Sequence, residues 1–197
     1  MKLGVLGGTF DPIHVGHLVL AERAREQLEL ERVLWVPAGE PWRKGHAVVA
    51  SKGVRVAMVE RAIAEHPEFE VCRLEVDRPG PSYTVETLAE LKELHHDSEL
   101  VFVLGRDALE DLPNWREPER IIEMALLAVA CRGAECLSGE ALERLLPGLA
   151  ARVVWVDMPR VDISATALRQ RAAEGRSLRH MVPEGVETYI RKRRLYR

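Results

Sequence analysis

Short apolar runs alternate with amphipathic stretches along most of this chain. Six of the runs are rich in β-branched or other apolar residues and have the length of buried strands, namely 2–6, 32–37, 68–74, 99–105, 126–131 and 152–157. Between them, apolar residues recur every three to four positions, as in helices that bury one face, over 15–28, 54–66, 84–95 and 139–149. This alternation predicts an α/β fold with a doubly wound, Rossmann-like parallel sheet and helices on both faces.

The 197 residues are expected to form one domain, with a small helical part from about residue 160. No internal repeat, low-complexity segment or domain linker interrupts the pattern. The least regular stretch, residues 37–53, is long for a loop in a compact domain and is predicted to act as a substrate loop. The closing RKRRLYR is expected to end a helix that begins after Pro183, with its cations near the negative end of the helix dipole.

Charge and cysteine content narrow the functional classes. The formal net charge of −3 gives no general attraction for a polyanion, so nucleic-acid binding is not expected. No run approaches eighteen apolar residues, which predicts a cytoplasmic protein without a membrane partner. Cys72, Cys131 and Cys136 form no C-x-x-C pair or metal-ligand cluster, so we expect a reducing compartment and treat Cys131 and Cys136 as ordinary small residues.

The segment GGTFDPIHVGH, residues 7–17, follows the first strand and leads into the first helix. A loop in that place lies at the carboxyl edge of the sheet, where open α/β sheets bind ligands. Gly7 and Gly8 leave room for a phosphate beside the backbone, Thr9 offers a hydroxyl, and the following amides point toward an anion at the helix start. The segment therefore predicts a phosphate cradle.

His14 and His17 are three residues apart, so they share one helical face, and Gly16 leaves that face open between them. Their imidazoles are predicted to converge on one anionic group. The segment contains neither a P-loop nor a G-x-G-x-x-G fingerprint, and two histidines without a third ligand are poor candidates for zinc. Solvent-exposed histidines at a helix start would explain either residue alone, but not the whole segment.

A second motif lies in VDISATALRQRAAEG near the other end of the chain. Ser164 is suited to cap a helix, and Thr166 and Arg169 are three residues apart on one face of it. Alone, this motif is ordinary helix capping. Together with the first motif it places two helix starts at the same sheet edge, where they could hold one polyphosphate from two sides.

The two motifs resemble the H-x-G-H and S-x-T-x-x-R motifs with which the nucleotidylyltransferase superfamily binds a nucleotide triphosphate. The resemblance covers nearly the whole chain and is closest to the nicotinate-nucleotide adenylyltransferase branch. The further segments that carry it are PSYT (81–84), LGRD (104–107), LPNW (112–115), Arg55 with Met58, and YIRKRRLY. One segment departs from the family: EPWRKG stands where a Pro-Pro-His-Lys-like sequence is common, and this affects Arg43 and Lys44.

The resemblance implies transfer of AMP from ATP to nicotinate mononucleotide, which gives nicotinate adenine dinucleotide and pyrophosphate in NAD biosynthesis. The acceptor phosphate is already a nucleophile at neutral pH, so direct in-line attack needs no covalent intermediate, and catalysis reduces to alignment and charge neutralisation. Mg²⁺ would travel with ATP, held mostly by phosphate oxygens and water rather than by protein ligands. The expected partners are these two substrates, and a homo-oligomer is left open.

The same resemblance assigns roles to individual residues. The expected catalytic residues are His14, His17 and Arg169. The expected ATP-binding residues are Gly7, Gly8, Thr9, Phe10, Gly16, Gly105, Asp107, Ile163, Ser164, Thr166 and Arg169. For the acceptor, Tyr83 and Thr84 would receive the carboxylate, Trp115 would stack on the pyridine ring, and Lys44 would bind the phosphate. A single Trp is more often a half-buried packing residue, but a position in a loop after a strand favours ligand contact here.

Three alternatives remain at this point. A phosphopantetheine adenylyltransferase would share the first motif, but such chains are usually shorter and lack the PSYT and Trp features. A cytidylyltransferase fits less well. A non-catalytic nucleotide-binding domain could keep the fold, but it would not need both histidines and Arg169, since a sensor requires binding and no contacts specific to a transition state.

Overall fold

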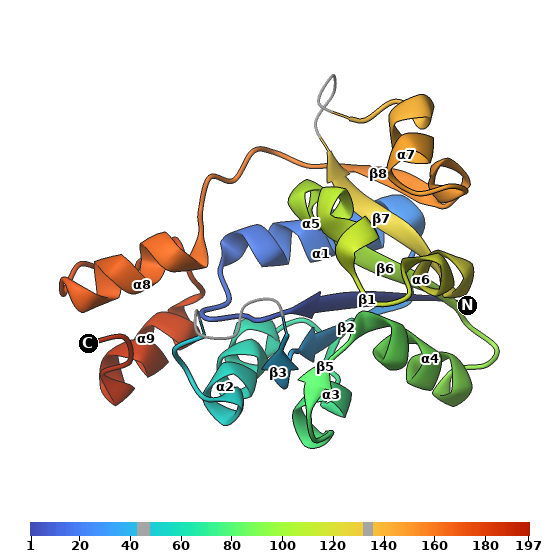
Figure 1. Ribbon diagram of the computed structural model, residues 1–197. Helices are drawn as coiled ribbons and strands as arrows, with labels where there is room; N and C mark the ends of the chain where they lie inside the picture. The colour runs from blue at the N-terminus through green and yellow to red at the C-terminus, as the bar shows by residue number, and fades with distance from the viewer. Residues whose placement is uncertain (43–47, 132–135) are drawn as a thin grey trace. The chain divides into compact units, whose positions relative to one another are not determined.

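The computed structural model describes residues 1–42, 48–131 and 136–197, and these residues form an α/β fold (Figure 1). Six strands form one mostly parallel sheet in the order β4-β2-β1-β6-β7-β8. Their bounds are β1 Lys2–Gly8, β2 Arg32–Pro37, β4 Phe69–Val71, β6 Glu99–Leu104, β7 Ala125–Cys131 and β8 Val153–Asp157. The predicted Rossmann-like fold is confirmed, and the six strands overlap the six runs predicted from the sequence.

The helices follow the predicted alternation with the strands. They are α1 Val15–Leu28, α2 Lys52–Ile63, α3 Leu74–Asp77, α4 Thr84–Leu94, α5 Arg106–Asp111, α6 Pro118–Met124, α7 Gly139–Leu145, α8 Ala165–Ala173 and α9 Glu184–Arg193. Two short 3₁₀ turns, η2 and η4, cover Leu112–Asn114 and Leu149–Ala151. In the described residues, no helix is long and apolar enough to cross a membrane.

The chain divides into two compact units, each built from three separate segments. Unit 1 consists of Met1–Gly7, Leu20–Leu34 and Tyr83–Arg160. Unit 2 consists of Gly8–Val19, Trp35–Ser82 and Val161–Arg197. The helical part expected from about residue 160 is therefore one segment of unit 2, together with the loop that follows β1.

Unit 1 contains the parallel pairs β1–β6, β6–β7 and β7–β8. The central residues of β1, β6 and β7 are apolar because parallel strands are usually buried on both faces. Val103 and Leu127, for example, are fully buried. In β1, a Cβ atom at Gly4 would lie 2.8 Å from a methyl carbon of Leu30, so a larger residue there would require the Leu30 side chain to shift.

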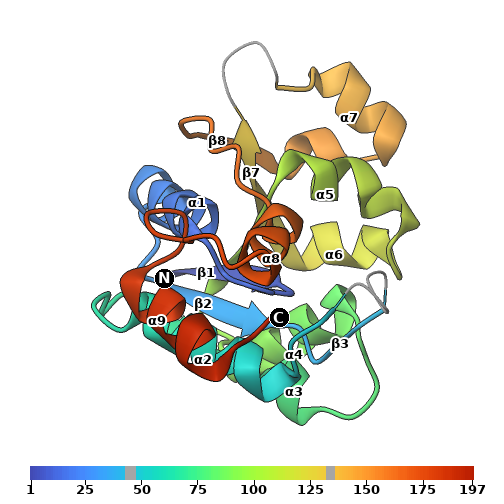
Figure 2. The same cartoon turned by 90° about the vertical axis from the view of Figure 1, so that its left-hand side faces the viewer.

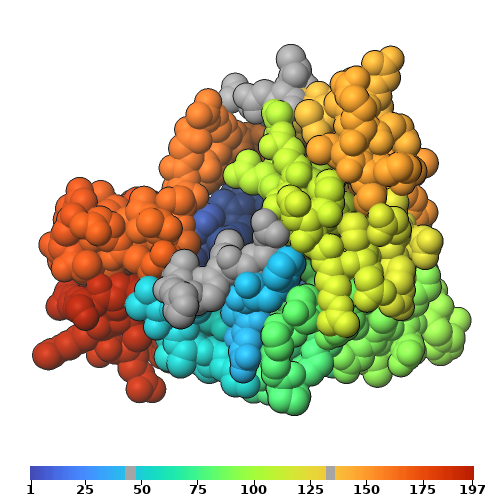
Figure 3. Space-filling model, in the orientation of Figure 1, coloured from blue at the N-terminus to red at the C-terminus, as the bar shows by residue number. Residues whose placement is uncertain are grey.

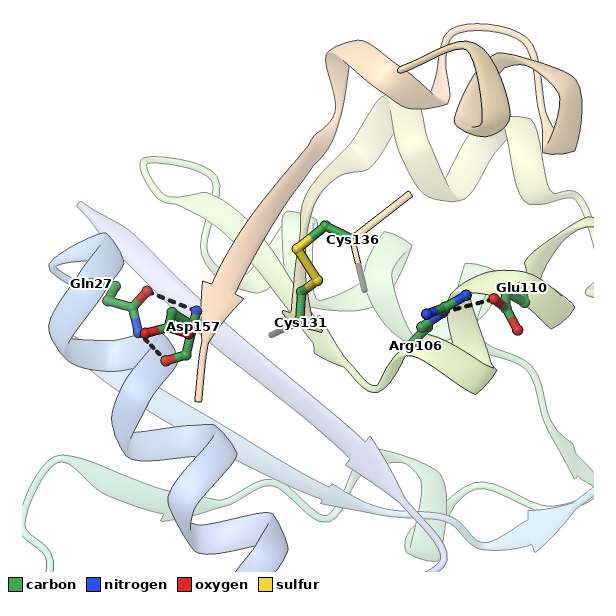
Figure 4. Close-up of a disulfide and its surroundings, with 6 residues drawn as sticks. All are labelled: Gln27, Arg106, Glu110, Cys131, Cys136 and Asp157. Atoms are coloured by element: carbon green, nitrogen blue, oxygen red, sulfur yellow. Dashed lines mark hydrogen bonds and ion pairs between the residues drawn. A yellow bond between two sulfur atoms is a disulfide. The ribbon is translucent and has the colours of Figure 1, made fainter. Parts of the chain in front are cut away.

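A disulfide in unit 1 corrects the expectation for the cysteines. Cys131 at the end of β7 is bonded to Cys136 (Figure 4), whereas Cys72 in unit 2 is not part of a disulfide. Cys131 and Cys136 are thus not ordinary small residues, and the cysteine content gives no support to a reducing compartment. The sequence pattern missed this pair because a separation of five residues fits no common disulfide or metal-binding motif.

Figure 4 also shows how the edge strand of unit 1 is held. The side-chain amide of Gln27 in α1 donates a hydrogen bond of 2.8 Å to the carbonyl of Asp157 in β8, and its oxygen accepts one of 3.0 Å from the Asp157 amide. These contacts satisfy backbone groups that a sheet edge otherwise leaves open. On α5, Arg106 and Glu110 form an ion pair of 2.8 Å.

In unit 2, α9 lies beside α2, as both views show (Figures 1 and 2). The Arg61 guanidinium lies 4.2 Å from the centre of the Tyr189 ring. Helix α9 begins after Pro183 and carries Arg191, Lys192 and Arg193 in its last turn, as predicted. The space-filling view shows the atoms of α8 in contact with those of α9 (Figure 3).

Unit 2 also contains a short parallel pair that the sequence pattern did not predict, β3 Glu40–Pro41 and β5 Pro81–Ser82. The buried Ser82 hydroxyl accepts hydrogen bonds from the amides of Gly39 at 2.9 Å and Glu40 at 3.2 Å. A Cβ atom at Gly39 would fall 2.0 Å from the carbonyl oxygen of Glu75, so a larger residue is excluded there. Two-residue strands are too short to show a period.

Candidate active site

The segment between β1 and α1 is built around the buried ring of Phe10. This residue has a left-handed backbone, with φ at 50°, and the next peptide bond, Asp11–Pro12, is cis. The Phe10 ring packs 5.5 Å from the Trp35 ring and meets the His17 ring edge to face at 5.2 Å. A Cβ atom at Gly8 would lie 2.8 Å from the Phe10 ring. Phe10, expected among the ATP-binding residues, is therefore a packing residue that supports the segment, and Gly8 makes room for its ring.

His14 and His17 lie face to face, as their spacing predicts. Their rings are stacked with centroids 3.8 Å apart, and the His14 amide donates a hydrogen bond of 3.2 Å to Nδ1 of His17. Because Nδ1 accepts this bond, a neutral His17 ring carries its proton on Nε2. This fixes Nε2–H as the side-chain donor of His17.

His14 is buried, with 9% of its surface exposed, and burial lowers its pKa from 6.5 to about 4. Its imidazole is therefore neutral at pH 7. Within the described residues, the buried Nδ1 atom has no hydrogen-bond partner. A Cβ atom at Gly16 would lie 3.1 Å from Nδ1, so Gly16 gives this ring the room that the sequence analysis expected.

The backbone amides at the start of α1 have partners inside the protein. The Val15 amide donates to the carbonyl of Met181 and the His17 amide to that of His14, both at 3.0 Å. The His14 amide is bonded to the His17 ring. The prediction that the amides here point toward an anion is therefore wrong for these three residues. The imidazoles, the Thr9 hydroxyl and neighbouring side chains remain as donors.

The second motif comes to the first within unit 2, as predicted. Nη1 of Arg169 donates a hydrogen bond of 2.8 Å to the carbonyl of Asp11, and Nη2 lies 3.3 Å from the Thr166 hydroxyl oxygen. The Ser164 hydroxyl accepts a bond of 3.2 Å from the Ala167 amide, so Ser164 caps α8 as expected. The guanidinium of α8 thus lies against the segment that carries His14.

A cavity of about 490 Å³ lies beside the start of α8. Ile163, Ser164 and Met181 are among the residues that line it. Met181 is also the residue whose carbonyl accepts from the first amide of α1. The start of α8 and the turn that touches the start of α1 therefore share one hollow, large enough for part of a nucleotide.

Unit 1 holds the aromatic residue predicted to bind the acceptor. Trp115 follows η2, is partly exposed, and donates from Nε1 to the Asp111 carboxylate at 3.0 Å. Its ring meets the edge of the Phe102 ring at 6.2 Å, and a Cβ atom at Gly7 would lie 3.5 Å from Phe102. The structure therefore brings Gly7 and Trp115 to the same phenylalanine, and it fixes the plane of the indole ring.

Tyr83 and Thr84 stand at the start of α4, where Tyr83 is the capping residue. The Arg116 guanidinium lies 4.6 Å from the centre of the Tyr83 ring and forms an ion pair of 2.8 Å with Glu86. Gly105 precedes α5, and a Cβ atom there would meet nothing within 4 Å.

Asp107 is exposed in the first turn of α5. Lys44 and Arg43 lie outside the described residues. Among the residues that are described, no three His, Cys, Asp or Glu side chains are grouped closely enough to hold a metal ion.

Residues 5–171 match the family described as cytidylyltransferase-like. The chain belongs to this family. It is 47% identical over 197 residues, all of both chains, to the "Probable nicotinate-nucleotide adenylyltransferase" of Thermus thermophilus. It is 45% identical over 196 residues to the protein of that name from Thermomicrobium roseum, which covers 100% of this chain and 92% of the relative. The predicted resemblance is confirmed, and this member of the cytidylyltransferase-like family is a nucleotidyltransferase.

Solved structures show the same fold at lower identity. The Plasmodium falciparum nicotinic acid mononucleotide adenylyltransferase complexed with NaAD has a TM-score of 0.80 and 21% identity, and the alignment covers 99% of this chain and 97% of that one. The same enzyme complexed with APC has a TM-score of 0.78 and 20% identity, with 99% and 96% covered. At 20% and 21% identity, this similarity shows only that the cytidylyltransferase-like chain has the same fold as these structures.

The sequence assigned no role at the site to three residues of this cytidylyltransferase-like chain, Asp11, Arg55 and Tyr196. Asp11 is 2% exposed, and its carboxylate accepts hydrogen bonds from the Val49 amide at 2.7 Å and the Tyr196 hydroxyl at 2.7 Å. Arg55 is 1% exposed and donates 2.8 Å to the carbonyl of Thr9. Burial lowers the pKa of Arg55, while the nearby Asp11 carboxylate raises it. These residues hold the backbone of the segment 8–17.

Arg55 could have been found from the sequence. It stands at a position where the three-to-four period of α2 calls for an apolar residue, and it is buried together with Met58 and Val59 on that helix. A charged residue at such a position needs partners inside the protein. Asp11 gave no comparable signal, because an aspartate before a proline is typical of an ordinary turn.

Proposed function

We propose that this chain transfers AMP from ATP to nicotinate mononucleotide, forming nicotinate adenine dinucleotide and pyrophosphate in NAD biosynthesis. The observation that carries the proposal is the contact between Arg169 of α8 and the carbonyl of Asp11, three residues before His14. This contact brings the motif near the start of the chain and the motif near its end together. In this proposal they form one group of phosphate-binding side chains. The relatives that share the whole chain length carry the matching name.

His14 and His17 act as neutral hydrogen-bond donors in this proposal. Burial keeps His14 uncharged at pH 7. Nδ1 of His17 accepts a hydrogen bond from the His14 amide, so His17 has Nε2–H as its donor. Donors that are fixed before the reaction stabilise the negative charge that develops on phosphate oxygens in the transition state. Arg169 supplies the positive charge, and only part of its five N–H donors is engaged by Asp11 and Thr166.

The chemistry needs no protein nucleophile. The acceptor phosphate attacks the α-phosphorus of ATP directly, and pyrophosphate leaves from the opposite side. Thr9, Ser164, Thr166 and Arg169 hold the β- and γ-phosphates of the leaving group, and Mg²⁺ enters with ATP, bound mostly by phosphate oxygens and water. The protein contributes alignment and charge neutralisation.

Residues of unit 1 select the acceptor in this proposal. Trp115 offers a partly exposed indole whose orientation is fixed by Asp111, which suits stacking on a pyridine ring. The start of α4 favours a carboxylate, because Thr84 is the first residue of this helix and the first amides of a helix lie at the positive end of its dipole. Gly105, Asp107 and Lys44 keep the roles that the resemblance implies.

The reaction course is tested with ATP that carries a chiral phosphorothioate at the α-phosphorus. The protein is incubated with this ATP, Mg²⁺ and nicotinate mononucleotide, and the dinucleotide is identified by mass and analysed for configuration. A nicotinate dinucleotide with inverted configuration supports a single in-line displacement. Retention would indicate a covalent intermediate, and a missing dinucleotide would contradict the proposed reaction.

The chain acts as a single nucleotidylyltransferase domain in this proposal, and we place the reaction in the cytoplasm, without nucleic acid or membrane as a partner. The net charge of −3 supports the absence of a polyanionic partner. The proposed chemistry does not require a particular oligomeric state. Size-exclusion chromatography with light scattering measures that state.

A further inference from the structure

We propose that Tyr196, the second-last residue of the chain, is a positioning residue for the phosphate-binding segment 8–17. Its hydroxyl lies 2.7 Å from Oδ1 of Asp11, a residue 185 positions earlier. Tyr196 acts on this segment through the Asp11 carboxylate. The inference rests on the proposed role of this segment in binding the phosphates of ATP.

Asp11 connects three parts of unit 2 through separate atoms. Its Oδ2 accepts from the Val49 amide at 2.7 Å, and its Oδ1 accepts from the Ala50 amide at 3.2 Å and from the Tyr196 hydroxyl. Its carbonyl accepts from Arg169. A buried carboxylate needs several donors to stay in place, and the tyrosine hydroxyl is the only side-chain donor to this carboxylate among the described residues.

Arg55 completes the support on the other side of Phe10. Its guanidinium donates to three carbonyls, those of Thr9 at 2.8 Å, Gly39 at 3.0 Å and Ala50 at 3.3 Å. The backbone on either side of Phe10 is therefore held by a cation at Thr9 and by a carboxylate at Asp11. A shift of either residue would move the peptide that leads to His14.

The end of the chain is shaped to deliver Tyr196 to this place. After α9 the chain turns back at Arg194, whose φ is 52°, and the Leu195 amide donates 3.1 Å to the carbonyl of Ile190 (Figure 2). Tyr196 itself has φ at 68°, an uncommon conformation for a large residue, which persists when surrounding contacts hold it. One such contact is Met58 of α2, whose sulfur lies 3.9 Å from the hydroxyl.

Electrostatics support the same role. Burial raises the pKa of Tyr196 far above its usual value, and the hydrogen bond with the Asp11 carboxylate raises it further. The hydroxyl therefore stays protonated and remains a donor throughout the range in which the enzyme can be assayed. Loss of this donor would leave Oδ1 of Asp11 with the longer bond to Ala50 alone.

The test compares Tyr196→Phe with Tyr189→Phe. Tyr196→Phe removes only the hydroxyl, whereas Tyr189→Phe removes one from α9 at a ring that contacts Arg61. ATP affinity is measured by calorimetry without acceptor, and turnover is measured at least 15 °C below the thermal midpoint. We expect Tyr196→Phe to weaken ATP binding and to lower kcat, each about five- to tenfold, as for the loss of one ordinary hydrogen bond. The affinity for nicotinate mononucleotide should stay at the wild-type value, whereas the thermal midpoint should fall modestly because the buried Asp11 carboxylate loses a donor.

Two further measurements separate positioning from a general structural role. Deletion of Arg197 alone should leave ATP affinity unchanged, while deletion of Tyr196 and Arg197 should weaken it at least as much as Tyr196→Phe. In a double-mutant cycle, Tyr196→Phe should add no further loss to Asp11→Asn if both act through one contact. Equal ATP affinity of Tyr196→Phe and Tyr189→Phe would overturn the inference, as would a matched fall in the affinity for both substrates together with the thermal midpoint.

These outcomes are distinguishable from a failure of the proposed reaction. If the wild-type protein binds ATP but forms no dinucleotide, the proposed acceptor is wrong, and the ATP affinities still test the role of Tyr196. If the wild-type protein does not bind ATP, the phosphate-binding segment itself is misassigned, and the inference about Tyr196 falls with it.

Discussion

The imidazole rings of His14 and His17 stack with centroids 3.8 Å apart, and the amide of one residue donates to the ring of the other. This relationship makes Nδ1 of His17 a structural acceptor and leaves Nε2–H as the donor of the neutral ring. It also ties the ring positions to the backbone at the start of α1. Substitutions can therefore remove the donor and the acceptor one at a time.

His17→Asn tests the donor. The asparagine oxygen can replace Nδ1 as acceptor for the His14 amide, but no group replaces Nε2–H. We expect kcat to fall by about 10²- to 10³-fold, as for other lost transition-state donors, with the thermal midpoint close to that of the wild type. Pyrophosphate release under saturating substrates measures the effect.

His17→Gln is the matched variant, because its longer side chain can place an N–H near the position of Nε2 while it loses the acceptor for the His14 amide. It should retain more activity than His17→Asn. If His17→Asn kept near-normal turnover, His17 would have no part in the mechanism.

Gly16→Ala tests the space beside His14. The new Cβ would lie 3.1 Å from Nδ1 and 3.2 Å from Cε1 of the His14 ring, so the ring must move. We expect kcat to fall at least tenfold, because small displacements of a catalytic group cost much of the rate. Gly53→Ala in α2 is the control, since its Cβ meets nothing within 4 Å and alanine favours a helix. Equal turnover of the two variants would show that the room at Gly16 is not needed.

The buried His14 makes stability depend on pH. Its pKa is lowered from 6.5 to about 4, so between these values the unfolded chain binds a proton that the folded protein does not. The free energy of unfolding therefore falls as pH falls from about 6.5 to about 4, by at most about 3 kcal/mol from this residue. Urea unfolding at pH 7.5 and pH 4.5 measures this for the wild type and for His14→Asn. The variant should lose less stability, and an equal loss in both proteins would contradict a neutral, buried His14.

Trp115→Ala should act on the acceptor alone. Loss of the stacking surface is expected to raise the KM for nicotinate mononucleotide about tenfold, while the KM for ATP stays within about twofold. Steady-state kinetics with each substrate varied in turn give both values. Trp155→Ala removes another partly exposed indole, on β8 of the same unit, and should leave both constants unchanged. An unaltered acceptor KM in Trp115→Ala would make Trp115 a packing residue.

The long periodic elements could be predicted from the sequence and the short ones could not. Helix α1 begins and ends at the predicted residues, 15 and 28, because fourteen residues show the three-to-four period several times over. The stretch 106–124 contains α5, η2 and α6, of six, three and seven residues, and none was predicted. One or two turns are too short to repeat a pattern.

The candidate site was predictable where its residues are close in sequence. His14 with His17, and Thr166 with Arg169, lie within one helical turn, so their shared faces follow from spacing. The bond between Asp11 and Tyr196 spans 185 positions and depends on how the chain ends fold back, which no local pattern contains. The bond from the Val15 amide to the Met181 carbonyl was missed for the same reason, whereas the bonds between His14 and His17 lie within one turn.

The most direct test of the proposed function is pyrophosphate release with ATP and Mg²⁺ and one of three acceptors in parallel: nicotinate mononucleotide, nicotinamide mononucleotide and phosphopantetheine. We predict the largest kcat/KM for nicotinate mononucleotide, and Trp115→Ala should lower kcat/KM for both mononucleotides, because they share the pyridine ring. Faster release with phosphopantetheine, or no release with any acceptor while ATP still binds, would contradict the proposed reaction.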